Sequence, residues 1–190
     1  MAKKIIVIFV EGQSEEAFYS KLCNTIQKDK GSSNKIIIKN LKGIGNYESK
    51  AFSKLKNEII PKYKNASFEV FCSYDTDVFD FPYQEKPPVD WKKVEDKISS
   101  LGYQLKHIKV NKAIEDWFLI DLEGLCLFLN IKKQSKLKGK NGYQKIKNLF
   151  SSANKIYQKG YNVGGFVDKL DFKIICDALK DDVKELIECM

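Results

Sequence analysis

The sequence predicts an α/β fold, in which a doubly wound, mainly parallel sheet is flanked by helices and followed by a C-terminal helical extension. Strand-like apolar runs alternate with segments whose apolar residues recur at helical spacing, as in parallel sheets with crossover helices. After residue 130 the strand-like runs stop and the chain becomes basic. With 190 residues, 43% of them hydrophobic, we expect an α/β domain over residues 1–130 and a basic helical extension, packed on it, over residues 131–190.

The first half of the chain contains four expected strands. They cover residues 4–10, 35–41, 68–74 and 103–110. The helices between them are expected to begin at Ser14, Asn46 and Asp90, whose side chains can cap a helix N-terminus. Pro61 should end or kink the second helix. The irregular segment 78–88 holds three of the four prolines and is expected to form a surface loop.

The second half is expected to be helical. The pattern predicts helices at 113–122 and 142–159, a basic loop at 132–142, a break at 160–165 and one or two short helices after Phe166. Three aromatic residues in the second of these helices, Tyr143, Phe150 and Tyr157, have the spacing of a base-stacking surface. Because Ile146, Leu149 and Ile156 share their helical face, core packing is the better interpretation.

Charge is distributed unevenly along the chain. The net charge is +8, and all 33 basic residues are lysines, so no guanidinium clamp for phosphates is available. Residues 124–167 contain nine lysines and no acid, so this segment carries +9 and the remainder −1. The segment could tether a polyanion or could simply be a solvated helix face. For tethering, the candidate contacts to a nucleic-acid backbone are Lys132, Lys133, Lys136, Lys138 and Lys140. Gly12 is a further candidate, because a glycine leaves room for a phosphate to approach the backbone.

The cysteines and the hydropathy pattern indicate the cellular compartment in which we expect the protein. The five cysteines are scattered and form no C-x-x-C pair, which argues against a zinc site or a disulfide framework. No apolar run approaches the roughly 20 residues that cross a bilayer, and the N-terminal sequence shows no cleavable signal pattern. We therefore expect a cytoplasmic protein with no membrane partner.

Acidic residues directly follow two of the expected strands. Glu11-Gly12 follows the first strand, and Asp75-Thr76-Asp77 follows the third. If these strands are parallel neighbours, the three carboxylates meet at the carboxyl edge of the sheet, where open α/β sheets bind ligands. Crowded carboxylates repel one another unless a cation neutralises them, and hard oxygen ligands suit Mg²⁺ or Mn²⁺. Taken singly, each acid could instead be an ordinary turn or loop residue.

The order of these motifs resembles the Toprim catalytic domain, which topoisomerases, bacterial primases and the small and overcoming-lysogenization-defect nucleases share. The motifs are Val10-Glu11-Gly12, Gly43-Ile44-Gly45 and Asp75-Thr76-Asp77, so the resemblance covers roughly residues 4–77. It implies a Toprim-like fold, with an acid–base or metal-binding role for Glu11 and a metal-binding role for Asp75 and Asp77. The longer Asp-x-Asp-x-Glu/Gly motif of primases and topoisomerases is absent, because Phe79 and Asp80 follow Val78.

The resemblance to nuclease-type Toprim proteins implies two further site residues. Glu115, chosen over its neighbour Asp116, would complete a second metal site, although a helix-start acid interacting with the dipole is an equal alternative. Lys159 would stabilise negative charge in the transition state. Glu15 could face the same site but is more simply a helix-start acid. The one histidine, His107, lies mid-strand and is expected to be structural.

The sequence thus predicts a Mg²⁺- or Mn²⁺-dependent nuclease that hydrolyses phosphodiester bonds in DNA or RNA through Glu11, Asp75 and Asp77. A first alternative is a nucleic-acid-binding module that acts only with a partner, and a protein partner in a defence or repair system would fit the resemblance. A second alternative is a phosphatase or nucleotidyl transferase with a small phosphorylated substrate. The absence of a G-x-x-x-x-G-K-[ST] motif argues against a P-loop NTPase.

Overall fold

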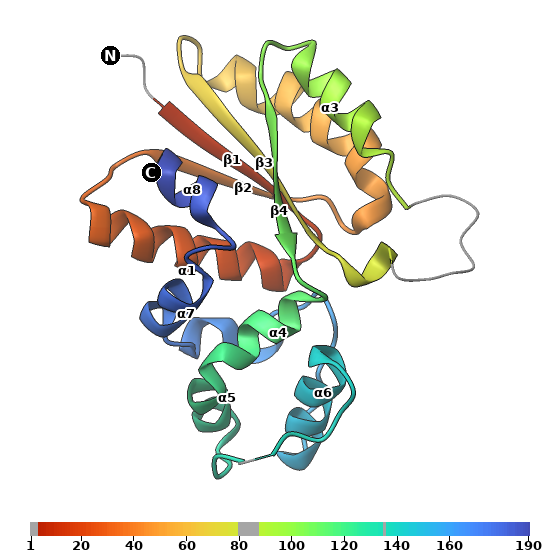
Figure 1. The fold of residues 1–190 in the computed structure, drawn as a ribbon, viewed down its shortest axis with the longest axis vertical. Helices are drawn as coiled ribbons and strands as arrows, with labels where there is room; N and C mark the ends of the chain where they lie inside the picture. Colours follow the sequence, from red (N-terminus) through yellow and green to blue (C-terminus); the bar gives the residue numbers. More distant parts are fainter. Residues whose placement is uncertain (1–3, 80–87, 135) are drawn as a thin grey trace.

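A computed structural model describes residues 4–79, 88–134 and 136–190. Its centre is a four-stranded, all-parallel sheet with the order β2-β1-β3-β4 (Figure 1). The strands are β1 (Lys4–Val10), β2 (Lys35–Asn40), β3 (Ser67–Asp75) and β4 (Leu105–Val110). The prediction of a parallel α/β sheet followed by C-terminal helices is therefore confirmed, and each strand agrees with its predicted run to within two residues.

Helices connect the strands and continue after the last one. They are α1 (Gln13–Lys30), α2 (Phe52–Lys54), α3 (Trp91–Ser99), α4 (Ile114–Phe118), α5 (Leu122–Leu129), α6 (Gly142–Ser152), α7 (Phe172–Leu179) and α8 (Lys184–Cys189). Wide π-helical turns, Tyr47–Ala51 and Leu55–Ile59, flank α2, and a 3₁₀ turn containing Pro61, Ile60–Lys62, ends that segment. Other 3₁₀ turns are Ile44–Asn46, Asp77–Phe79, Leu119–Asp121 and Val163–Lys169.

The sheet is covered on both faces, which explains why β1, one of its two inner strands, is a continuous apolar run. Residues 5–10 of β1 are all fully buried. Ile6, Ile8 and Val10 pack in one core with α1 and the helices after β4, while Ile5 and Val7 pack in a second core with residues 47–63 and α3. The first core extends to Cys189, so the C-terminal helices share the hydrophobic interior of the sheet. Figure 1 shows α7 and α8 beside α1 on that face.

Two of the three predicted helix caps differ in the structure. The prediction that Ser14 caps α1 is wrong, because the helix begins at Gln13 and the Ser14 hydroxyl donates to Glu15 Oε2 at 2.7 Å. Asn46 makes no side-chain cap either, and its amide donates to the Lys42 carbonyl at 2.7 Å. Asp90 does cap α3, since its Oδ1 accepts the Lys93 N–H at 3.2 Å.

The helix predicted over 142–159 is shorter in the structure. It ends at Ser152, and Asn154 then adopts a left-handed conformation with φ of 54° that takes the chain out of the helix. Ile156 is consequently 84% exposed, whereas Tyr157 lies buried in the loop with its ring 5.3 Å from that of Phe150. Core packing of this aromatic residue is confirmed, but its helical position was a wrong prediction.

The segment predicted as a surface loop at 78–88 begins within the 3₁₀ turn Asp77–Phe79, and its residues 80–87, including Asp80, lie outside the described residues. His107 lies on β4, where its Nε2 is 2.9 Å from Glu95 Oε1 and its ring contacts Trp91 edge-on. Within the described residues, none of the helices combines the length and the apolar character that crossing a bilayer requires.

Asp121 fixes the return of the C-terminal helices, and its replacement provides a test of this packing. The buried carboxylate accepts the Gly124 N–H at 2.9 Å and the Asp171 N–H at 2.6 Å. We expect Asp121→Ala to lower the free energy of unfolding by about 1–3 kcal/mol, because both donors lose their acceptor. Urea denaturation measures this, with the exposed Asp177→Ala as control. Equal losses in the two variants would contradict the structural role.

Candidate functional site

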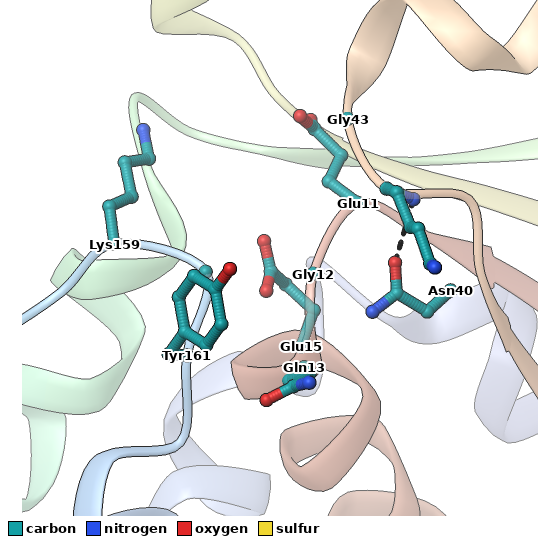
Figure 2. A pocket seen from close by; sticks show the side chains of 10 residues that line it. Glu11, Gly12, Gln13, Glu15, Asn40, Gly43, Lys159 and Tyr161 are labelled. Carbon is teal, nitrogen blue, oxygen red and sulfur yellow. Dashed lines mark hydrogen bonds between the residues drawn. The ribbon is translucent and has the colours of Figure 1, made fainter.

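A cavity of about 440 Å³ opens at the carboxyl end of β1 and β2, as expected for an open α/β sheet. Three segments form it: the β1–α1 connection, the β2 end and the loop that precedes Val163–Lys169 (Figure 2). Its lining residues are Glu11, Gly12, Gln13, Glu15, Asn40, Lys42, Gly43, Lys159, Gly160 and Tyr161. Sequence segments separated by more than 100 residues therefore build one site.

Asp75 links Glu11, which follows β1, to Lys159. It is the last residue of β3 and is only 4% exposed. Its backbone N–H donates to Glu11 Oε1 at 3.3 Å, and its Oδ1 accepts the Ile114 N–H at 2.8 Å. Its other oxygen, Oδ2, lies 3.2 Å from Lys159 Nζ. The side chains of Glu11, Asp75 and Lys159, predicted from three separate segments, are thus brought together.

Burial and mutual repulsion favour the protonated forms of these acids. Burial raises the pKa of the Glu11 carboxyl to about 8, and the negative charge of Asp75 adds to the shift. Burial likewise raises the pKa of Asp75 to about 6, although the positive charge of Lys159 opposes the shift. Glu15 lines the same cavity as Glu11 and is 7% exposed, and burial is also the main cause that raises its pKa. One lysine therefore does not fully compensate this group of carboxylates.

Glu115 is fully buried and belongs to the same group. Its Oε1 accepts the Tyr157 hydroxyl at 2.8 Å, while Oε2 has no hydrogen-bond partner among the described residues. Burial raises its pKa, against the opposing effects of Lys159 and Tyr157. The neighbouring Asp116 packs elsewhere, against the first residue of α6: a Cβ added at Gly142 would lie 2.7 Å from Asp116 Cγ. Of these two acids, the structure thus brings Glu115 toward the predicted site.

Lys159 is the basic counterpart of the acids. Burial lowers its pKa, but Asp75, Glu115 and Asp77 outweigh this effect and hold the pKa above its usual value. Asp77 begins the 3₁₀ turn after β3 and is half-buried, and its N–H donates to the Lys112 carbonyl at 3.0 Å. Lys159 therefore remains fully charged at neutral pH.

Residues 159–161, here called the strap, are held against the start of α1. The Gly160 carbonyl accepts the N–H groups of Gln13 and Ser14, at 2.7 and 3.3 Å, and so replaces the missing side-chain cap. A Cβ at Gly12 would lie 2.9 Å from Gly160 Cα, so only glycine permits this approach. Gly160 occupies the side of Gly12 on which a Cβ would lie, while Gly12 still lines the cavity, and its contact with a nucleic-acid backbone stays a prediction.

The basic residues chosen from the loop between α5 and α6 do not line the cavity. Lys132, Lys133, Lys136, Lys138 and Lys140 are all exposed, and Lys133 forms an ion pair with Glu123 at 3.0 Å. In Figure 1 this loop runs from the end of α5 along α6 to the start of that helix, where Gly142 packs against Asp116. Sequence reasoning missed Tyr157, Gly160, Asn40 and Lys42 as site residues. Of these, only Asn40 and Lys42 carried a signal, since they flank the end of the second strand.

The donor set agrees in its chemistry with a hard divalent cation, since carboxylate oxygens gather there with insufficient positive charge and Glu115 Oε2 lacks a donor. Throughout the part of the chain that the structure describes, however, no three histidine, cysteine or acidic side chains are already arranged to hold a metal ion. The side chains would have to close around a bound ion.

No protein-family model and no curated protein matches the chain. Among solved structures, the C-terminal region of the Burkholderia pseudomallei OLD protein is similar at 14% sequence identity, with a TM-score of 0.35. That similarity covers 100% of this chain and 86% of the other.

The raised pKa of Glu11 makes stability depend on pH. Between its ordinary pKa of 4.5 and the folded value of about 8, the folded protein binds more protons than the unfolded chain. The free energy of unfolding therefore falls as pH rises through this window. In EDTA, we expect Glu11→Gln to flatten this decline and to exceed wild type by about 1–3 kcal/mol above pH 8, with no gain below pH 4.

Urea denaturation across pH 4–9 measures this difference, and the exposed Glu16→Gln is the matched control. Glu16→Gln should follow the wild-type pH profile. A Glu11→Gln profile parallel to wild type would contradict the burial of this carboxyl among other acids.

The close approach of Gly12 and Gly160 is tested by adding one methyl group. In Gly12→Ala the new Cβ would meet the Gly160 backbone at 2.9 Å and Glu15 Oε2 at 2.8 Å, so the strap must move. We expect a loss of about 1–3 kcal/mol in the free energy of unfolding. Gly45→Ala is the control, because nothing lies within 4 Å of its added Cβ. Equal stability of Gly12→Ala and Gly45→Ala would show that the strap is not held as described.

Proposed function

We propose that this chain is a Mg²⁺- or Mn²⁺-dependent nuclease that hydrolyses phosphodiester bonds in DNA or RNA. The observation that carries the proposal is the meeting of Glu11, Asp75 and Glu115 with Lys159 at the carboxyl edge of the sheet. The order of the sequence motifs, which resembles Toprim domains, supports the same assignment. A site that combines crowded carboxylates with one partly buried ammonium suits a metal-bound, negatively charged substrate.

Glu11, Asp75 and Asp77 would hold the metal ion, and Glu115 would add a ligand for a second one. When bound, the metal would supply a Lewis acid for the phosphate and lower the pKa of a bound water. Each carboxyl that binds must first lose its proton, so the raised pKa values of Glu11 and Asp75 make metal binding stronger at higher pH. The buried Tyr157 hydroxyl keeps Glu115 oriented through its hydrogen bond to Oε1.

Lys159 acts directly on the substrate in this proposal. Its ammonium lies 3.2 Å from Asp75 Oδ2 and is 44% exposed, so it can also contact a phosphate oxygen in the cavity. A fixed positive charge there stabilises the negative charge that develops during phosphodiester cleavage. The hydrogen bonds from the start of α1 to the Gly160 carbonyl hold Lys159, the preceding residue of the strap, in place.

The exposed lysines between α5 and α6 are proposed to bind the nucleic-acid backbone outside the cavity. Such contacts neutralise phosphates without reading the sequence of bases. They also make affinity strongly dependent on salt. For each tenfold rise in salt concentration, log K falls by roughly 0.9 per duplex phosphate neutralised.

A second candidate is hydrolysis or transfer at a small phosphorylated molecule. The cavity volume of about 440 Å³ favours it, since small-ligand sites measure roughly 300–1,000 Å³. Salt separates the two candidates, because a small substrate neutralises few phosphates and its affinity should change little between low and physiological salt.

Cleavage assays with defined variants test the nuclease proposal. Supercoiled plasmid, single-stranded DNA and RNA are incubated with wild type, Glu11→Gln, Asp75→Asn or Lys159→Ala, in Mg²⁺, Mn²⁺ or EDTA. We expect cleavage only with metal, and a loss of about 100-fold or more in each variant, because each removes a ligand or a charge that acts on the transition state.

Glu16→Gln serves as the control, since Glu16 is exposed and adjoins the site without lining the cavity. It should cleave like wild type. Cleavage that persists in EDTA, or variants of Glu11 and Asp75 that cleave as fast as wild type, would contradict the proposal.

A further inference from the structure

Tyr161 is an aromatic side chain that the proposed chemistry does not use. It ends the strap, lines the cavity and is 48% exposed. The other aromatic rings of this region pack on one another, as in the pairs Tyr143–Tyr157 and Phe150–Tyr157. Among the ring pairs found in the described residues, by contrast, none includes Tyr161. Its ring is thus not part of the core, and among the lining residues of the cavity it is the one aromatic side chain.

The Tyr161 ring shares the cavity with the charged side chains of Glu15 and Lys159. Figure 2 shows Tyr161 beside Glu15 on the strap side of the cavity, opposite Asn40 and Gly43. Lys159, two residues earlier in the strap, points its ammonium at Asp75, and Lys42 also lines the cavity. A phosphate held between Lys159 and the acids would therefore place its attached sugar and base beside an exposed aromatic face.

We propose that Tyr161 is a stacking surface for a nucleobase, and that the site consequently takes an unpaired nucleotide within a single-stranded nucleic acid. This inference rests on the proposed function, whose substrate class it narrows. An unpaired base offers its flat face to an aromatic side chain regardless of its identity. In a continuous duplex both faces of each base are covered by neighbouring bases, so Tyr161 could stack only after a base leaves the helix.

The cavity size agrees with one nucleotide as the occupant. Its volume of about 440 Å³ falls within the range of roughly 300–1,000 Å³ that is typical of small-ligand sites. Asn40 and Gln13, in the same lining, bring amide groups that can hydrogen-bond to a base or a sugar. Because base stacking tolerates every base, we expect a preference for single strands over duplex without a strong sequence preference.

Binding and cleavage of matched oligonucleotides test this inference. A fluorescein-labelled 12-nucleotide single strand and a hairpin duplex of equal charge are titrated in Ca²⁺, a cation that carboxylate oxygens bind, with wild type, Tyr161→Ala and Tyr161→Phe. We expect tighter binding of the single strand by wild type, a loss of roughly 5- to 150-fold with Tyr161→Ala and near-complete retention with Tyr161→Phe. Affinity for the duplex should be the same for all three proteins.

The control variant is Ile156→Ala, which removes an 84% exposed apolar side chain from the loop before the strap. It should bind both oligonucleotides like wild type. Equal losses for single strand and duplex in Tyr161→Ala, or an unchanged single-strand affinity, would overturn the inference.

The same oligonucleotides with Mn²⁺ separate this inference from the proposed function. If wild type cleaves and Tyr161→Ala cleaves the single strand equally well, the stacking role is wrong while the nuclease assignment stands. If no protein cleaves but Tyr161→Ala selectively loses single-strand binding, the stacking role stands and the nuclease assignment fails.

Discussion

The crowding of carboxylates around Lys159 is the interaction on which the rest of this site depends. Parallel strands bring Glu11 and Asp75 to one edge of the sheet, and the Asp75 N–H to Glu11 hydrogen bond fixes their relation. Burial and like charge raise both pKa values, to about 8 and about 6. Several acids and one lysine are more costly to bury than apolar side chains of similar size, and this cost supports the proposal that the group serves the function of the protein.

The C-terminal half belongs to the site because of the strap. Lys159 lies almost 150 residues after Glu11, yet the Gly160 carbonyl caps α1 directly beside Gly12. Tyr157, just before the strap, supports Glu115 from the same loop. The shared core of α1, α7 and the sheet holds this loop in place. Positioning of the ammonium thus depends on how the helices after β4 pack against the sheet.

The sequence predicted most accurately the features that depend on local pattern. Apolar runs located β1, β2 and β3, and an alternating pattern located β4. Acids at strand ends placed Glu11 and Asp75 at one edge, because strand direction alone determines that meeting. Tyr157 was placed on a helix because its spacing from Phe150 continues the helical period. The left-handed turn at Asn154 leaves no sign in that pattern. The capping of α1 by Gly160 is a tertiary contact, so local propensity led instead to Ser14.

The location of bound metal tests the proposed acidic site most directly. Crystals grown with Mn²⁺ can be measured at the manganese absorption edge, where anomalous scattering places the ion without assumptions about its ligands. We expect an anomalous peak within coordination distance, about 2.0–2.4 Å, of oxygens of Glu11, Asp75 and Asp77. An anomalous peak at another place, with Lys159 still paired to Asp75 and no manganese between these acids, would contradict the proposed metal site.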